Sequence, residues 1–143
     1  MTKMIFVNLA VNDVARATEF YRAIGCVQDT RICKGPEASM MTWSDAIHFM
    51  LLDKAHYASF TTKQIADSRA TSEVMLCLSM DDRAGVDAIT EKALAAGGTE
   101  SRAAQDYGFM YGRAFEDLDG HIFEPMWMDV EAAMAAMDQT EAA

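Results

Sequence analysis

The chain has few of the residues that build disulfide frameworks or membrane spans. Its 143 residues include three cysteines, Cys26, Cys33 and Cys77, whose spacing is not that of a metal site. An odd, sparse set of this kind favours reduced thiols in a cytosol over a disulfide framework. No apolar run is long enough to cross a membrane, and the first residues lack the pattern of a signal peptide. We therefore expect a cytoplasmic protein with no membrane partner.

Basic residues are also scarce. Lys and Arg total 12 against 22 Asp and Glu, which gives a net charge of −10. A chain this acidic repels phosphate backbones, and no basic stripe interrupts the acidity, so we expect no nucleic-acid partner. Hydrophobic residues make up 51% of the chain and charged residues 24%, a balance typical of a globular protein. The length fits one domain, or two small halves that share a core.

The same order of elements occurs twice along the chain. Residues 5–11 alternate as a strand, Asp13 can cap the helix that follows, and Gly25 can end it. The same succession of strand, Asp cap, helix and Gly stop returns at residues 74–97. Because runs typical of antiparallel strands follow both helices, we predict two βαβββ modules.

Two stretches lie outside the repeated pattern. Residues 54–72 are polar and rich in Ala, Ser and Thr, which predicts a linker with one or two short helical turns. Residues 129–143 predict either a terminal helix that buries Met134 and Met137 or a flexible tail. The predicted division is a single domain over 1–128, made of module one (1–60), the linker (54–72) and module two (73–128).

The second module closes with a predicted β-hairpin. Two runs rich in aromatic and apolar residues flank residues 117–120, where Asp and Gly favour a turn. If those four residues form the loop, Glu116 faces His121, and Arg113 lies opposite Glu124. A loop longer or shorter by one residue would move Arg113 to the other face of the sheet. In the predicted register, one face carries Tyr111, Arg113, Phe115, Ile122, Glu124 and Met126.

The opening at residues 11–25 and the closing stretch at 116–124, together with the paired modules, resemble the vicinal oxygen chelate superfamily. That group includes glyoxalase I, extradiol ring-cleavage dioxygenases, and bleomycin- and fosfomycin-resistance proteins. The resemblance covers residues 4–128 and is specific for the fold, not for a reaction. It implies an α+β fold with curved mixed sheets around a concave cavity and helices on the outer face. It also implies a homodimer, because the inner sheets of this fold commonly complete each other across subunits.

The resemblance also implies where a metal site would lie. Metal-dependent members take one ligand from the first and last strand of each module, usually His or Gln, Glu, His and Glu. The matching positions here are Phe6, Met50, Met75 and Glu124. Phe has no donor atom, and thioether sulfur suits Cu(I) better than the divalent ions of this chemistry. We therefore expect no cofactor and no metal at the usual site.

A displaced metal site stays open as an alternative. Its ligands would be Asn8, His48, Cys77 and Glu124, the first three of which lie two residues from a lost ligand position. A shift of two residues along a strand moves a side chain by about 6–7 Å, which works against convergence with Glu124.

Two residues are candidates for acid–base chemistry. Glu124 would face a largely apolar cavity, where burial raises the pKa of a carboxyl group towards neutrality, or it would pair with Arg113. His48, predicted on the same inner face, is either a base or a hydrogen-bonded core residue. The side chains predicted to contact a ligand are Asn8, Met50, Met75, Cys77, Tyr111, Arg113 and Met126.

Three functions remain open at this point. The first is a metal-free protein that binds a small apolar or aromatic molecule, which the adaptable Met50, Met75 and Met126 favour. The second is a lyase, isomerase or ring-cleavage dioxygenase that uses a displaced metal site or acid–base chemistry at Glu124 and His48. The third is a structural or interaction module.

Overall fold

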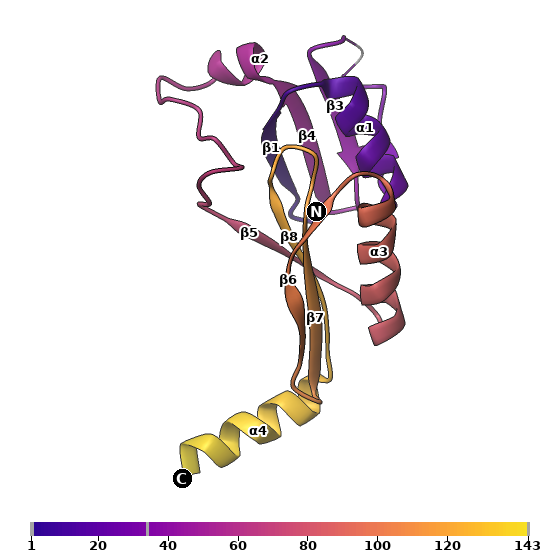
Figure 1. Cartoon of the computed structure of the whole chain (residues 1–143), viewed down its shortest axis with the longest axis vertical. Helices are drawn as coiled ribbons and strands as arrows, with labels where there is room; N and C mark the ends of the chain where they lie inside the picture. Colours follow the sequence, from indigo (N-terminus) through magenta and orange to yellow (C-terminus); the bar gives the residue numbers. More distant parts are fainter. Residues whose placement is uncertain (1, 34, 143) are drawn as a thin grey trace.

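The computed structural model describes residues 2–33 and 35–142, which form two four-stranded mixed sheets and four helices (Figure 1). The first sheet has the order β1 (Ile5–Val11), β4 (Ile47–Asp53), β3 (Ala38–Thr42), β2 (Val27–Gln28). The second has the order β5 (Met75–Ser79), β8 (Ile122–Met128), β7 (Met110–Glu116), β6 (Thr99–Asp106). The helices are α1 (Val14–Ala23), α2 (Lys54–Ala58), α3 (Arg83–Ala95) and α4 (Val130–Ala142). The predicted α+β fold is confirmed.

Each sheet repeats one plan, in which the first strand pairs in parallel with the last and the remaining neighbours are antiparallel. The local signals that start and stop the long helices act as expected. The side chain of Asp13 accepts a hydrogen bond from the backbone N–H of Arg16, 3.1 Å away, and so caps α1. Gly25 follows α1 with a φ of 113°, a conformation that residues with a Cβ rarely adopt.

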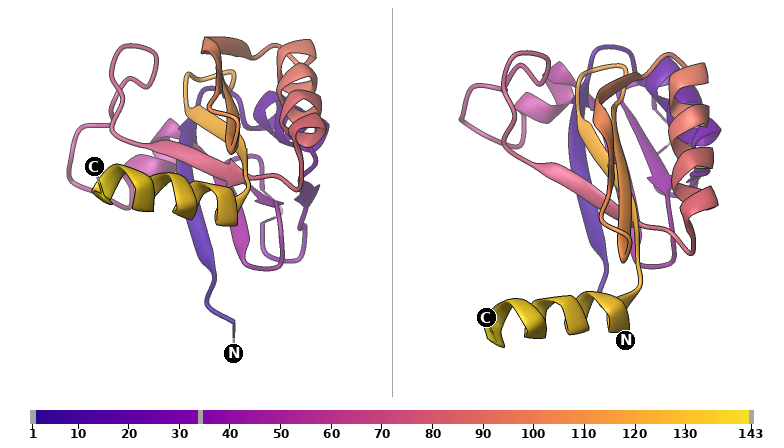
Figure 2. Two further views of the ribbon diagram at one scale, coloured as in Figure 1. Left: turned by 90° about the horizontal axis from the view of Figure 1, so that it is seen from below. Right: turned by 60° about the horizontal axis from the view of Figure 1, so that its bottom comes forward.

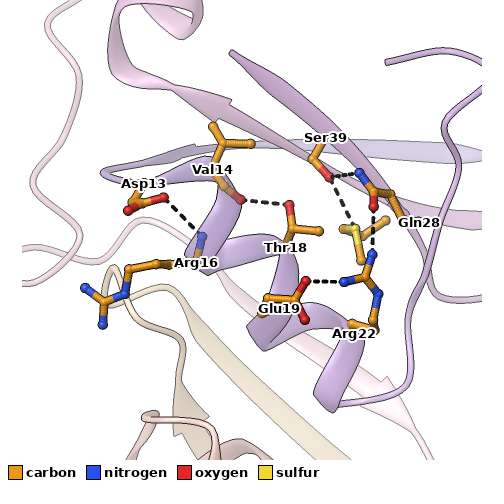
Figure 3. A network of polar contacts seen from close by, with 9 residues as sticks. Asp13, Val14, Arg16, Thr18, Glu19, Arg22, Gln28 and Ser39 are labelled. Carbon is orange, nitrogen blue, oxygen red and sulfur yellow. Dashed lines mark hydrogen bonds and ion pairs between the residues drawn. The ribbon is translucent and has the colours of Figure 1, made fainter. Parts of the chain in front are cut away.

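Side-chain contacts fix α1 against its own sheet, as Figure 3 shows. Arg22 pairs with Glu19 one turn earlier and donates to Gln28 Oε1 on β2 at 2.7 Å. Gln28 in turn donates to Ser39 Oγ on β3 at 3.3 Å. This chain of polar contacts holds the outer strands β2 and β3 against α1.

The two modules share one hydrophobic core beneath α1 and α3, which lie on the same side of the sheets in all the views (Figures 1 and 2). The ring of Phe123 on β8 meets Tyr21 of α1 at 5.8 Å between ring centroids and Phe49 of β4 at 5.4 Å. Phe115 on β7 stacks on the same ring at 5.5 Å. Aromatic rings from both modules therefore pack as one cluster on the helix-covered side of the sheets.

The hairpin register differs from the predicted one by one residue. Glu116 pairs with Ile122 and Gly112 with Met126, so the loop spans residues 117–121 instead of 117–120. Asp117 causes the difference: it is buried, and its Oδ1 accepts the backbone N–H groups of Asp119 and His121, each at 2.9 Å. Because side chains alternate along a strand, the shift moves Tyr111 and Arg113 to the helix-covered face.

Two segments stand apart from the packed core. Residues 59–74, which contain no helix or strand, lie beyond β1 on the side away from α1 and α3 (Figures 1 and 2). Helix α4 leads away from the end of β8 (Figure 2), and Met134 and Met137 are 61% and 66% exposed. The expectation that a terminal helix buries these two methionines is therefore wrong. Within the described residues, no helix is long and apolar enough to cross a membrane.

Candidate functional site

The candidate site is the face of the sheets that points away from α1 and α3, called here the open face. In module one, the parallel pairing of β1 with β4 sets Phe6 beside His48 and Asn8 beside Met50. Alternation along both strands puts these four side chains on the open face, as the sequence predicted, because Leu9 and Phe49 point into the core.

The side chain of His48 is buried and is fixed by contacts with two neighbours. It is 7% exposed, its Nδ1 lies 3.0 Å from Thr42 Oγ1, and its ring stacks on that of Phe6 at 4.7 Å and 15°. Its Nε2 is buried and has no hydrogen-bond partner among the described residues. An unpaired buried polar atom costs on the order of 1–3 kcal/mol, and a ligand group that completed this hydrogen bond would recover part of that cost. Phe6, which is exposed, covers the ring.

The open face of module two is charged. Across the parallel pair of β5 and β8, Cys77 lies beside Glu124, whose Oε1 accepts a hydrogen bond from Arg102 Nη1 on β6 at 2.8 Å. The side chains of Glu124 and Arg102 are 22% and 33% exposed. Glu124 is therefore the carboxylate of a partly buried ion pair, and its partner is Arg102 instead of the predicted Arg113.

Arg102 was missed because β6 is irregular. The pairing of β6 with β7 shifts between Glu100 and Arg102, and again between Arg102 and Gln105. These shifts decide which side chains of β6 reach the open face, and the period-2 pattern of a regular strand cannot predict them. An arginine on the strand next to the hairpin was the one available signal.

The surroundings of Cys77 disfavour its thiolate. Partial burial raises the pKa of the thiol, the Glu124 carboxylate raises it further, and Arg102 opposes the rise. Because the thiolate is the nucleophilic form, Cys77 is a poor nucleophile at neutral pH.

Tyr111 and Arg113 do not join the open face. Tyr111 donates its hydroxyl to Asp87 on α3 at 2.6 Å. Arg113, 12% exposed, pairs with Asp87 at 3.1 Å, Glu91 at 2.8 Å and Glu100 at 2.9 Å. The hydrogen bonds to these carboxylates, that to Glu100 first, raise the pKa of Arg113, while that from Tyr111 contributes most to lowering the pKa of Asp87. These two predicted ligand contacts instead fasten α3 to β7.

The donor chemistry of the open face does not fit the divalent ion that metal-dependent members of the vicinal oxygen chelate superfamily bind. Phe6, Met50 and Met75 offer no oxygen or nitrogen side-chain donor, and Glu124 is paired with Arg102. Nor do three or more His, Cys, Asp or Glu side chains gather as a metal site anywhere in the described part of the chain. The displaced metal site considered above would use Asn8, His48, Cys77 and Glu124. In the structure, His48 contacts Thr42 through Nδ1, and its ring lies against Phe6.

Two adjoining cavities lie between β1 and the segment 59–74. The larger, of about 310 Å³, is bounded by side chains that include Asn8, Leu52, Tyr57, Phe60, Ile65 and Glu73. The smaller, of about 140 Å³, shares Asn8, Tyr57, Ile65 and Glu73 and reaches His121 and Ile122 of module two. Of the predicted ligand contacts, Asn8 lines both cavities, whereas Met50, Met75, Cys77 and Met126 line neither. The isolated apolar residues Tyr57, Phe60 and Ile65 within a polar stretch were the available signal.

The family follows from a direct comparison of the sequence. Residues 3–124 match the Glyoxalase/Bleomycin resistance protein/Dioxygenase superfamily, and the chain belongs to that superfamily.

Several solved structures share the fold. A hypothetical protein from S. aureus is 24% identical with a TM-score of 0.74, over 89% of this chain and 94% of its own. A glyoxalase/bleomycin resistance protein/dioxygenase family enzyme from Burkholderia phytofirmans PsJN is 18% identical with a TM-score of 0.72, over 89% and 99%. A glyoxalase-related enzyme from Fulvimarina pelagi is 19% identical with a TM-score of 0.73, over 89% and 88%. No curated protein matches the chain. Likeness at these identities establishes the fold and leaves the ligand open.

Proposed function

We propose that this protein binds a small apolar or aromatic molecule in the cavities between β1 and residues 59–74, without a divalent metal ion. The observation that carries the proposal is the larger cavity, whose walls include Leu52, Tyr57, Phe60 and Ile65. Ligand sites are typically concave and mostly apolar, with a few polar groups that orient the ligand. Asn8, at the junction of the two cavities, offers such a group, because its amide both donates and accepts.

The side chains on the rest of the open face support binding over metal chemistry. Phe6, Met50 and Met75 occupy three of the four positions that hold ligands in metal-dependent members. Glu124, at the fourth, is neutralised by Arg102.

The alternative is a lyase, isomerase or ring-cleavage dioxygenase, and one observation favours it. The Nε2 atom of His48 is buried and has no hydrogen-bond partner in the described residues, as expected of a group that binds a substrate. His48 and Glu124 belong to different sheets, and each already contacts a neighbour, Thr42 or Arg102. Metal analysis of protein purified without chelator separates the two functions. A near-stoichiometric divalent ion bound through Glu124 would overturn the proposal.

A thermal-shift screen of small aromatic compounds tests the binding site. Tyr57→Ala and Asn8→Ala should abolish or weaken the shifts that hits produce, because both side chains line the cavities. Glu124→Gln is the matched control on the open face of module two and should leave the shifts intact. Shifts that vanish in Glu124→Gln and persist in Tyr57→Ala would place the site on module two and refute the proposal.

We also propose that two copies of the chain form a homodimer through their open faces. Phe6 and Met75 are exposed large apolar side chains on those faces, and uncovered apolar surface of this kind marks interaction sites. Sedimentation velocity should show a dimer that Met75→Lys weakens. A wild-type monomer at micromolar concentration would contradict this.

A further inference from the structure

Two charged side chains that line the larger cavity have no partner among the residues that the structure describes. Lys63 and Glu73 both line it, and neither side chain makes a hydrogen bond or ion pair with any other described residue. This contrasts with Arg83, Arg102 and Arg113, all of which are engaged by carboxylates. Within the described part of the chain, the cavity therefore offers an ammonium group and a carboxylate, neither of them paired, beside its apolar side chains.

The two charges occupy different parts of the cavity system. Glu73 lines both cavities, together with Asn8 and Tyr57, and so stands at their junction. Lys63 and Phe60 line the larger cavity and not the smaller one. A molecule that fills the larger cavity therefore meets the Glu73 carboxylate where the two cavities adjoin, the Lys63 ammonium group elsewhere in the lining, and the rings of Tyr57 and Phe60. The cavity volume, near the lower end for ligand sites, limits the molecule to about the size of an amino acid.

We propose that the ligand is a small aromatic zwitterion, whose ammonium group pairs with Glu73 and whose carboxylate pairs with Lys63. This inference rests on the proposed function and names the ligand class for that same site. Charge-assisted hydrogen bonds are stronger than neutral ones, but Lys63 and Glu73 are exposed, so water screens both pairs in part. The aromatic body stacks against Tyr57 and Phe60, which accounts for two aromatic side chains at the edge of an otherwise polar segment.

Four probes that share one ring system test the inference by calorimetry. L-Tryptophan carries both charges, tryptamine the cation, indole-3-propionate the anion, and indole neither. L-Tryptophan should bind about fivefold more tightly than either singly charged probe and more tightly still than indole. The advantage should shrink as the salt concentration rises from 20 mM to 0.5 M, because screening weakens both ion pairs.

Two single substitutions assign each charge. Glu73→Gln should weaken L-tryptophan and tryptamine by about fivefold and leave indole-3-propionate unchanged. Lys63→Gln should weaken L-tryptophan and indole-3-propionate to the same degree and leave tryptamine unchanged. Glu131→Gln on α4 and Lys92→Gln on α3 remove the same charges outside the cavity and should change none of the four affinities. Because all four positions are exposed, the variants should melt at the wild-type temperature.

The outcomes separate this inference from the function beneath it. If all four probes bind equally, and Tyr57→Ala weakens all of them, the cavity binds aromatic molecules but the zwitterion is refuted. If the charge preference is present but unaffected by Glu73→Gln and Lys63→Gln, the assignment of the two charges is refuted. If no probe binds in a manner sensitive to Tyr57→Ala at millimolar concentration, the site itself is refuted as well.

Discussion

The open faces of the two modules differ in chemistry although their backbones follow one plan. In both, the first strand pairs in parallel with the last. Module one has a histidine covered by Phe6 and a cavity beside Asn8, whereas module two has the ion pair of Glu124 with Arg102. The core that joins the modules uses the opposite side chains of the same strands. The fold therefore constrains one face by packing and leaves the other free to acquire a different chemistry in each module.

The largest expected effect comes from breaking the shared core. Phe123→Ala should lower the free energy of unfolding by about 3–5 kcal/mol, because it removes a fully buried ring that contacts both modules. Trp43 and Trp127 report on one module each, so Trp43→Phe and Trp127→Phe backgrounds let each module be followed by fluorescence in urea. The free energy of unfolding measured by each tryptophan should fall by the same amount. A Trp127 transition that moves while the Trp43 transition stays would show two independent modules.

A second comparison is between Arg113, on the helix-covered face, and Arg102, on the open face. Arg113→Gln should cost about 2 kcal/mol in urea unfolding, since it leaves three carboxylates without their cation, although their partial exposure limits the loss. Arg102→Gln should cost less than about 1 kcal/mol, because its one carboxylate partner is partly exposed. Equal losses, or the reverse order, would contradict the hairpin register described above.

The free energy of unfolding should depend on pH through Asp117, which links the two modules. Tyr21 of α1 donates its hydroxyl to Asp117 Oδ2 at 2.6 Å, and burial raises the pKa of Asp117 above its usual 3.8. The carboxyl group of Asp117 therefore binds its proton more tightly in the folded state than in the unfolded state. The stability that this proton contributes is fully present below pH 3.8 and is lost as the pH rises through the folded pKa. Asp117→Asn should flatten this fall when unfolding free energies are compared from pH 4 upwards. A variant with an unchanged slope would show that other groups cause it.

The smallest expected effect concerns Cys77 and its charged neighbours. In a Cys33→Ser background, where Cys26 stays buried, Glu124→Gln should speed alkylation of Cys77 by iodoacetamide a few-fold, because it removes a charge that raises the thiol pKa. Arg102→Gln should slow the reaction, because Arg102 opposes that rise. Mass spectrometry measures both rates. Two variants with the wild-type rate would show that Glu124 and Arg102 do not act on Cys77.

Local sequence signals predicted the parts of the fold that local interactions determine. Asp13 and Gly25 marked the ends of α1, because capping and a positive φ depend on a few neighbouring residues. The hairpin register could not be derived in this way. The loop is one residue longer than predicted because it includes His121, and it is held by Asp117, which is buried and accepts a hydrogen bond from Tyr21 of the other module. The position of Arg102 on the open face could not be predicted either, because it depends on the irregular pairing of β6 with β7.

The cavity was outside the reach of sequence patterns for a related reason. The segment 59–74 has no periodic pattern, and its course depends on distant contacts such as that of Arg69 with the carbonyl oxygen of Leu118. Asn8 was predicted as a ligand contact because alternation along β1 is a local property. Tyr57, Lys63 and Glu73 were not, because only the folded chain brings them to the same cavity.

The most direct test of the proposed function is a titration of methyl-labelled protein with indole, followed by NMR. Binding in the cavity beside β1 should shift the methyl signals of Leu52 and Ile65, which line it, and leave those of Met75 and Met126 unchanged. Shifts confined to Met75 and Met126 would place the ligand beside Glu124 on module two and contradict the proposed site.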